Sequence, residues 1–432
     1  MGQLCAKSND HLTNKIVRLA KNKKYHSLGI LLKDSLDKQY SLKKLKNLAS
    51  QIDSQPLLDA IHATKRLYAT HQKLSIKPSE FLQNALFILT ELPTYCEKSC
   101  FLTSELTGLQ DTIEYDPVTK KAFIHLDRYK NAWVGRGSKK WVLKSLLFDV
   151  KNPQIVARAE QIEPMTHELE ICKIMRGARG VINMHAWTTH TTEQNTFTTL
   201  YLDLHKPGSI RYLLQHKEKS PFTPGEVSKI MYQLLTGLNS FHSKNLSHRD
   251  LHDGNCFISI NKAKGSRKKI HAVIADLGRT LVLDQANGTK AQGAKMFSPP
   301  ESWTVDQMEG NDYLTSDIYA LGCVFYRLFF NTLAPWQGLY LKDKELTKEE
   351  KKTLLTMKLY DACVKRRNQL VKKNQKRALP LKQALELLIL KMVHVNPAKR
   401  GSASSLREEA KAILLNGRAS EKLHLLLGES AD

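Results

Sequence analysis

Apolar residues recur at helical spacing through the first quarter of the chain. They fall three, four or seven positions apart, as expected for the buried face of an amphipathic helix. The clearest runs are Leu12, Ile16 and Leu19; Leu28, Leu31 and Leu32; Leu57, Leu58 and Ile61; and Phe81, Leu82, Leu86 and Leu89. The pattern predicts a helical N-terminal domain over residues 1–115. No catalytic group accompanies it, so we expect residues 1–110 to be dispensable for the chemistry of the remainder.

The pattern changes after Pro93 to short runs rich in Val, Ile, Phe and Trp, which are typical of strands. Ala122 to Leu126 and Trp141 to Phe148 are the strongest of these runs. From about residue 206 long amphipathic patterns return, with strand-like interludes at Cys256 to Ile260 and Ala272 to Ala275. The chain is therefore predicted to run from helices to a sheet and then to a mostly helical region.

Composition adds a strong positive charge to this picture. The 432 residues carry a formal net charge of +24, which favours polyanionic partners such as ATP, acidic proteins or an anionic membrane face, although a solvated lysine-rich surface is the alternative. The seven cysteines are odd in number and scattered, and Cys96 with Cys100 lacks the second pair of a zinc site. We expect a reducing, cytoplasmic setting.

The first residues, MGQLCAKS, suggest a membrane link. Gly2 would become the N-terminus after removal of Met1, and Cys5 would offer a second acylation site, although Ala6 replaces the preferred Ser or Thr. The basic residues that follow would supply an electrostatic signal to an anionic membrane surface. An unprocessed terminus is the alternative, and no leader or membrane-spanning pattern is present.

The densest chemistry lies in the stretch SHRDLHDGN, residues 247–255. Apolar runs flank it on both sides, so this polar segment is expected between two buried elements. A hydrophobic run then delivers Asp276, Leu277 and Gly278, an acid at a strand end followed by a residue that permits a sharp turn. Asp250 could meet an incoming hydroxyl, while Asn255 and Asp276 offer the hard oxygens that Mg²⁺ prefers.

These motifs resemble those of the eukaryotic-type protein kinase family. HRDLHDGN matches the catalytic loop and DLG the metal-binding motif, with Leu277 in place of Phe. Three later motifs, PPE, SDIYALG and NPAKR, at residues 299–301, 316–322 and 396–400, resemble family motifs of the large lobe. The resemblance implies an α+β, bilobal kinase-like fold behind the helical domain. The implied limits are 118–205 for a small β-rich lobe, 206–416 for a large helical lobe with a basic insertion near 340–378, and 417–432 for a tail.

The resemblance assigns a role to each motif residue of the large lobe. Asp250 would orient or deprotonate the acceptor hydroxyl, and Asn255 and Asp276 would hold the metal beside the ATP phosphates. His252 occupies a catalytic-loop position that is usually Lys in serine/threonine kinases. Scaffold roles would fall to His248, Arg249, Gly278, Glu301, Asp317 and Arg400, with Glu301 and Arg400 forming an ion pair.

The ATP-binding residues of the small lobe are harder to assign. Val142-Leu143-Lys144 resembles the strand whose lysine grips ATP phosphates and pairs with an acid on the next helix, here Glu168, with Glu170 as the alternative. In the alternative register, Gly135 to Val142 is the phosphate loop and Lys151 is the lysine. Gly135 and Gly137 are interpreted as a hairpin turn, which leaves Asp127 to Ala132 as a glycine-free phosphate loop.

Further nucleotide contacts would come from Asp127 and Tyr129 in that loop, and from Asp203 and His205 in the segment Leu200 to His205 that would meet adenine. Arg249 could bind a phosphate on the segment before the PPE motif. The candidate phosphorylation sites there are Thr280, Thr289 and Ser298.

Three function classes follow, in order of preference. The first is an ATP- and Mg²⁺-dependent protein kinase, with Ser/Thr preferred because the Tyr-specific loop pattern is missing. The second is a kinase-like scaffold with weak or no transfer, favoured by the glycine-free loop. The third is a small-molecule kinase of the aminoglycoside or choline type, suggested by His252 and Gly254. The basic block at 365–377 lacks interleaved aromatic residues, so nucleic acid is not an expected partner.

Overall fold

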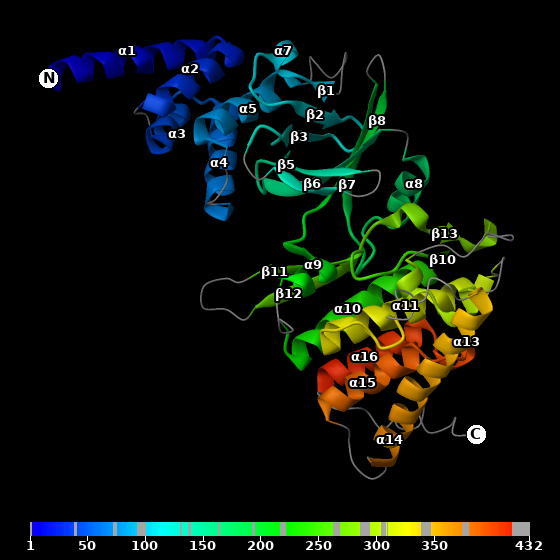
Figure 1. Ribbon diagram of the computed structural model, residues 1–432. Helices are drawn as coiled ribbons and strands as arrows, with labels where there is room; N and C mark the ends of the chain where they lie inside the picture. The colour runs from blue at the N-terminus through cyan, green and yellow to red at the C-terminus, as the bar shows by residue number, and fades with distance from the viewer. Residues whose placement is uncertain are drawn as a thin grey trace. The chain divides into compact units, whose positions relative to one another are not determined.

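Figure 1 shows the computed structural model, which describes most of the chain. The chain forms two compact units. The described residues are 2–38, 41–71, 76–92, 101–129, 132–136, 140–162, 165–191, 195–216, 222–261, 268–285, 294–303, 308, 310–337, 347–373 and 380–416. Unit 1 comprises Met1–Met165 and Met184–Leu204, and unit 2 comprises Thr166–Asn183 and His205–Asp432.

Unit 1 begins with helices. They are α1 (Gly2–Lys21), α2 (Tyr25–Lys38), α3 (Leu42–Gln51), α4 (Gln55–Thr70), α5 (Pro78–Thr90) and the short α7 (Ser104–Thr107). The predicted apolar runs fall in α1, α2, α4 and α5, whereas α3 and α7 were not marked by a run of their own. Local signals fix their starts: Ser41 accepts a hydrogen bond from the backbone of Lys44, and a proline stands in the first turn of α4 and of α5.

The rest of unit 1 is an eight-stranded antiparallel sheet. The strands are β1 (Phe101–Leu102), β2 (Ile113–Asp116), β3 (Lys121–His125), β4 (Trp133–Arg136), β5 (Trp141–Phe148), β6 (Gln154–Ile162), β7 (Met184–Thr191) and β8 (Thr196–Asp203). Their order is β1-β2-β3-β5-β6-β8-β7, and β4 pairs with β5. The sheet starts with β1 and β2, earlier than residue 118, where the sequence predicted the β-rich lobe to begin. The prediction missed these two strands because both are short.

The helices and the sheet of unit 1 share one hydrophobic core. Buried side chains of the helices and of β2, β3 and β5 form a single cluster, in which the rings of Phe81 and Phe148 lie 6.3 Å apart. Polar contacts reinforce the junction, because Arg128 Nε lies 2.6 Å from Asp111 and its guanidinium 3.2 Å from Glu80. The helical region is therefore built into unit 1.

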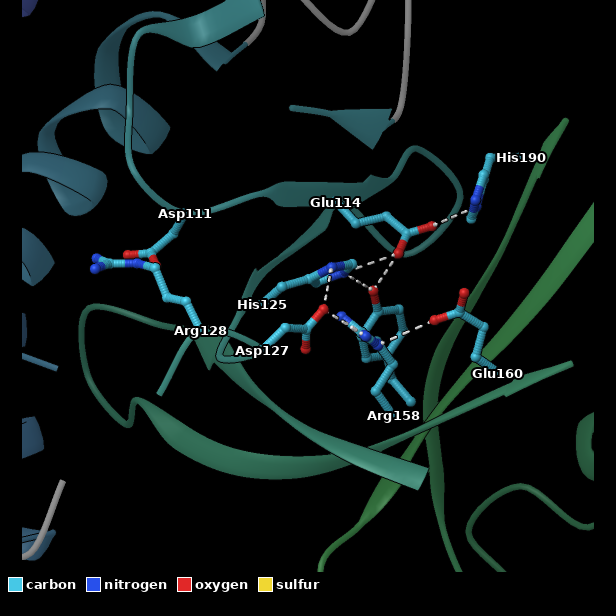
Figure 2. Close-up of polar contacts among 9 residues, drawn as sticks. Asp111, Glu114, His125, Asp127, Arg128, Arg158, Glu160 and His190 are labelled. Atoms are coloured by element: carbon cyan, nitrogen blue, oxygen red, sulfur yellow. Dashed lines mark hydrogen bonds and ion pairs between the residues drawn. The ribbon is translucent and has the colours of Figure 1, made fainter. Parts of the chain in front are cut away.

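The opposite face of the sheet encloses a buried polar cluster (Figure 2). Glu114 accepts from His125 Nε2 at 3.1 Å and from the hydroxyl of Tyr201, and its other oxygen lies 3.8 Å from His190. Burial alone raises the pKa of Glu114, but the hydrogen bond from His125 brings it below its usual value. This carboxylate joins β2 to β7, which contact each other although they are far apart in the strand order.

Unit 2 is mainly helical. Its helices are α8 (Thr166–Ile174), α9 (Ile210–Gln215), α10 (Pro224–His242), α11 (Gly310–Phe330), α13 (Lys348–Leu359), α14 (Arg366–Lys373), α15 (Leu381–Met392) and α16 (Ala403–Asn416). A π-helical turn, η5 (Tyr360–Lys365), joins α13 to α14 within the predicted basic insertion. The long helix α10 starts at a capping box between Thr223 and Glu226 and packs against α16 and α11.

Short strands and turns complete unit 2. The strands β9 (Pro207–Ser209), β11 (Cys256–Asn261) and β12 (Lys269–Ile274) form one sheet, and β10 (Leu246–Ser247) pairs with β13 (Leu281–Val282). The 3-10 turns are η1 (Leu277–Arg279), η2 (Leu283–Gln285), η3 (Lys295–Phe297), η4 (Pro300–Trp303) and η6 (Pro397–Lys399). Within the described ranges, no helix is both long and apolar enough to cross a bilayer.

Two glycines allow the segment after α8 to touch helix α10. Gly180 has a φ of +74°, and a Cβ there would lie 2.5 Å from the backbone nitrogen of Gly237. A Cβ on Gly237 would in turn overlap the carbonyl oxygen of Gly180. The close approach places this segment beside β12, where the Ile274 N–H donates to the Gly180 carbonyl oxygen at 2.9 Å.

This contact predicts an inverted effect of alanine in α10. Alanine normally stabilises a helix by about 1 kcal/mol relative to glycine, but Gly237→Ala should destabilise the protein by at least about 2 kcal/mol through overpacking. Gly225→Ala in the same helix is the matched control, because nothing lies within 4 Å of its Cβ position. Urea unfolding measures both. Equal midpoints for the two variants would contradict the proposed backbone contact.

The shared core replaces our expectation that the N-terminal helices are dispensable. We predict that deleting residues 1–92 exposes the apolar face of the sheet and abolishes cooperative unfolding of unit 1. Binding of a hydrophobic dye and the loss of near-UV circular dichroism would report this change. A deletion variant that unfolds cooperatively at the midpoint of the full chain would show that the sheet needs no helical cover.

Candidate active site

The buried carboxylate of Asp317 on α11 organises the loop between β10 and β11. It accepts hydrogen bonds from the backbone N–H of His248 at 2.8 Å and of Arg249 at 2.9 Å. The hydroxyl of Ser247 donates to it at 2.9 Å, and His242 Nε2 lies 3.2 Å away. Arg249 has a φ of +64°, so the loop turns sharply where the carboxylate holds it.

These donors also set the charge of Asp317. Burial alone raises its pKa, but the hydrogen bond from His242, the nearby His248 and the backbone N–H of Arg249 lower it below the usual value. The side chain is 2% exposed and stays ionised. As the resemblance implied, Asp317 acts as a scaffold for the loop.

The same loop is joined to the end of strand β12. His248 Nε2 lies 3.1 Å from the carbonyl oxygen of Ala275, and the backbone N–H of Ala275 donates to the carbonyl oxygen of Asn255 at 2.8 Å. The side-chain amide of Asn255 donates to the carbonyl oxygen of Asp250 at 2.9 Å. The two acid-bearing turns, which are distant in the sequence, therefore belong to one hydrogen-bonded assembly.

Helix α8 packs against the turn that follows β12. A Cβ on Gly278 would lie 3.3 Å from Glu168 Oε2 and 3.6 Å from Asp276 Oδ1, so both carboxylates border this glycine. His167 Nε2 contacts the carbonyl oxygen of Thr280 at 2.7 Å. Asp276 is exposed and has a φ of +62°, whereas Glu168 is buried. The arrangement holds Glu168 close to the Asp-Leu-Gly motif within unit 2.

Both carboxylate oxygens of Asp250 contact groups of the protein itself. The backbone N–H of Ala294 donates to Oδ1 at 3.1 Å, and Arg279 Nε lies 3.5 Å from Oδ2. A small pocket that opens to solvent lies beside Asp250. Its lining includes Arg249, Leu251, Phe297, Ser298, Met308 and Tyr313.

Sequence reasoning missed a cluster in the middle of this loop. The carboxylate of Asp253 is fully buried and accepts from Arg211 Nε at 2.9 Å and from the guanidinium of Arg327. Gly254 lacks a Cβ where the ring of His252 and the guanidinium of Arg211 leave no room. Burial lowers the pKa of His252, and Arg211 lowers it further against the opposing effect of Asp250 and Asp253. The partners lie on α9 and α11, and no local motif marks them.

The predicted ion pair between Glu301 and Arg400 is present. The Arg400 side chain is fully buried and donates to Glu301 Oε2 at 3.0 Å, and also to the carbonyl oxygens of His394 and Thr315. Every polar end of the guanidinium thereby gains an acceptor, which offsets the cost of burying its charge. This pair fixes η4 to the turn that follows η6, ahead of α16.

Comparison with known proteins gives this arrangement a family. Residues 137–410, more than half of the chain, match the model of the protein kinase domain. The chain belongs to the protein kinase family.

The chain is similar to several serine/threonine-protein kinases. Serine/threonine-protein kinase PLK4 of Drosophila grimshawi is 31% identical over 152 residues, which cover 34% of this chain and 18% of that protein. Serine/threonine-protein kinase par-4 of Caenorhabditis elegans is 33% identical over 129 residues, 28% of this chain and 19% of that protein. The probable serine/threonine-protein kinase zyg-1 of Caenorhabditis briggsae is 28% identical over 174 residues, 40% and 22% respectively. The matched segments span about a fifth of each relative.

The strand that precedes α8 in this chain is β6, which the sequence analysis did not anticipate. Its only cation, Arg158, is 3% exposed and donates to Asp127 at 2.8 Å. Lys144 lies one strand earlier, half-buried in β5, and Lys151 is exposed in the bend between β5 and β6. The assignment of an ATP lysine therefore stays a prediction, with β5 rather than β6 carrying the favoured candidate.

The predicted phosphate loop is tied to the rest of unit 1. Asp127 bonds Arg158, and the hydroxyl of Tyr129 donates to Glu80 at 3.0 Å and to Asp111 at 3.1 Å. Burial, followed by the two carboxylates, raises the pKa of that hydroxyl. The antiparallel pair of β4 and β5 forms the expected hairpin, but Gly135 lies in β4, paired with Val142, and not in the turn. Gly137 lies outside the described residues.

The segment that was predicted to meet adenine, Leu200 to His205, includes residues of both units. Asp203 ends β8 in unit 1, and its carboxylate lies 2.7 Å from His185 Nε2. The ring of His205 in unit 2 stacks on Phe257 at 6.4 Å and on His271 at 5.9 Å. Their predicted contacts with nucleotide remain predictions.

The three candidate phosphorylation sites differ in accessibility. Thr280 is 1% exposed, so its hydroxyl can be reached only after this segment has opened. Ser298 is half-buried and donates to the carbonyl oxygen of Ala294 at 3.4 Å. Thr289 lies outside the described residues.

We predict that Asp317→Asn lowers the free energy of unfolding by about 3 kcal/mol, because an amide NH₂ would face at least one of the buried N–H donors. The folded-state pKa of Asp317 lies below the unfolded value of about 3.9, so the carboxylate stabilises the protein above that pH and loses this effect as the pH falls through the folded pKa.

The difference between the wild type and Asp317→Asn in urea unfolding should therefore shrink below about pH 4. Asp361→Asn serves as the control, because Asp361 forms only an exposed pair with Lys365. A difference between the wild type and Asp317→Asn that stays constant from neutral pH to pH 3 would exclude an ionised Asp317 as the anchor of the loop.

Proposed function

We propose that this protein is an ATP- and Mg²⁺-dependent protein kinase that phosphorylates serine or threonine hydroxyls. The observation that carries the proposal is that the loop with Asp250 and Asn255 is hydrogen-bonded to the end of β12, directly before Asp276. The carboxylate of Asp317 holds the backbone of the same loop. A phosphoryl transfer site needs a positioned acceptor for the hydroxyl proton and hard oxygen ligands for the metal. Family membership and the names of the relatives support the same activity.

The oxygen donors fit a magnesium ion. The NH₂ group of Asn255 donates to the carbonyl oxygen of Asp250, so Oδ1 of Asn255 is the atom that would face the metal. The carboxylate of Asp276 is exposed. No group of three or more His, Cys, Asp or Glu in the described ranges suits a metal. Two protein ligands suffice for Mg²⁺, which commonly completes its shell with phosphate oxygens and water. The ion would neutralise charge on the ATP phosphates.

The remaining side chains would orient the acceptor. Asp250 would accept the proton of the incoming hydroxyl, and that hydroxyl would have to displace Arg279 and the N–H of Ala294 from the carboxylate. His252 would stand beside the transferred group, and Lys144 would contact the ATP phosphates from a small β-rich lobe. The same proposal includes a two-lobed kinase fold and a cytoplasmic location. Acylation at Gly2 or Cys5, together with the basic residues of the N-terminal region, would bind the protein to an anionic membrane surface.

A kinase-like scaffold is the second candidate, and one observation favours it. The resemblance expects the ATP lysine on the strand directly before the helix of Glu168, but in β6 the only cation is Arg158. That guanidinium is committed to Asp127 and lies 3.4 Å from Glu160. If Lys144 does not contact the ATP phosphates in place of a cation on β6, nucleotide binding will be weak.

A phosphoryl transfer assay tests these alternatives. The full chain with labelled ATP and Mg²⁺ should phosphorylate a generic protein substrate, and Asp250→Ala and Asp276→Ala should each lower the rate by about 10²- to 10⁴-fold. Asp361→Asn, an exposed change on η5, should leave the rate unchanged. Transfer that survives both active-site variants would come from a contaminant and would refute the proposed site.

Nucleotide binding separates the two candidates. Lys144→Met should weaken Mg-ATP binding and transfer together, while Arg158→Met should act mainly on the stability of unit 1. Metal-dependent binding without transfer would instead support the scaffold, and transfer only to a small alcohol would support the small-molecule kinase that the sequence left open.

A further inference from the structure

Arginine side chains surround the loop that carries Asp250. Arg249 lies within the loop, Arg279 follows the Asp-Leu-Gly motif, and Arg211 reaches the loop from α9. All three belong to unit 2. Arg249 is half-buried and its guanidinium lies 5.5 Å from the centre of the Tyr313 ring, so it serves the fold. The other two guanidinium groups have exposed surface.

Arg211 has donors to spare. Its Nε donates to Asp253 and one terminal nitrogen lies 3.4 Å from His252 Nδ1, yet 41% of the side chain is exposed. A guanidinium carries five N–H donors in a planar fork that matches a carboxylate. Its carbon also lies 3.2 Å from the position a Cβ would take on Gly254, so the exposed part is next to the catalytic loop.

Arg279 is a weakly held cation at the reacting carboxylate itself. Its side chain is 52% exposed, and its Nε lies 3.5 Å from Asp250 Oδ2. This contact ends when Asp250 turns to an acceptor hydroxyl. The guanidinium would then be left without that partner, one side chain away from the bound substrate.

The one buried acid of the Asp253 cluster does not neutralise both arginines that contact it. Asp253 is fully buried and shared between Arg211 and Arg327, so this cluster retains one positive charge in excess. The carboxylate of Asp250 balances the charge of Arg279 only while the two side chains remain in contact. The net charge of +24 for the whole chain gives no long-range compensation.

We propose that Arg211 and Arg279 select acceptor proteins that carry acidic residues close to the phosphorylated hydroxyl. A carboxylate beside the hydroxyl would meet the exposed fork of Arg211 or take the place of Asp250 on Arg279. A basic neighbour would meet like charge there. The inference rests on the proposed kinase function and names the substrate class of that same site.

Arg211 could instead serve only to hold Asp253 in place. In that case its replacement would affect acidic and neutral substrates equally, whereas a selecting residue changes the ratio between them. Within the described ranges Arg279 makes no comparable scaffold contact, so it tests the selection independently of the fold.

Peptide binding tests the proposal without relying on catalysis. We would label two peptides that differ only in glutamate or glutamine on both sides of an alanine at the acceptor position, and measure fluorescence anisotropy with the full chain and Mg-ATP. The glutamate peptide should bind about tenfold more tightly at low salt, and the preference should fade near 0.5 M salt through screening. Equal affinities at low salt would overturn the inference.

Variants assign the preference to the two residues. Arg211→Gln and Arg279→Gln should each lower the preference for the glutamate peptide at least threefold, and the double variant should abolish it. Arg211→Lys keeps the charge and should retain part of the preference. Arg407→Gln on α16, whose partner is the adjacent Glu408, is the matched control and should bind like the wild type. A preference that persists in the double variant would also overturn the inference.

The transfer assay with serine at the acceptor position separates this inference from the proposed function. Equal kcat/KM for glutamate and glutamine peptides would refute the substrate class and leave the kinase intact. Absence of transfer to both peptides would refute the kinase, while the binding ratio would still decide the role of the arginines.

Discussion

One buried carboxylate, that of Asp317, supports the geometry on which the candidate site depends. A loop of polar residues cannot hold its shape between two apolar elements unless its backbone donors find acceptors. Asp317 supplies them to two consecutive N–H groups and to the hydroxyl of Ser247. The loop can then place Asp250 and Asn255 next to the end of β12 without a longer rigid element of its own.

Much of unit 2 could be predicted because its chemistry is local in sequence. The stretch 247–255 and the Asp-Leu-Gly motif each contain their own turn, and the hairpin of β11 and β12 between them follows from two short apolar runs. The partners of Asp253 could not be predicted. Arg211 and Arg327 come from helices 42 residues before it and 74 residues after it, and a lone arginine in an amphipathic helix is usually solvated.

Unit 1 was harder to predict because its sheet buries charge. The strand β6 carries Arg158 and Glu160 among its apolar residues, and such residues normally mark a surface or a loop. In the fold Arg158 pairs with Asp127, and Glu114 accepts hydrogen bonds from His125 and Tyr201. Polar side chains therefore occupy buried strand positions at which a sequence pattern expects apolar residues. For the same reason the sequence did not predict that the N-terminal helices pack on the sheet. This packing involves the polar contacts of Arg128 with Glu80 and Asp111 as well as the apolar core.

The contact between Gly180 and Gly237 also limits how this sequence can diverge. A side chain on either glycine would overlap the main chain of the other. A substitution at one position therefore does not make room for a side chain at the second. Lineages descending from this protein would have to move the whole segment away from α10 before either position could drift. The pair should therefore be inherited as a unit, even where neighbouring surface residues vary freely.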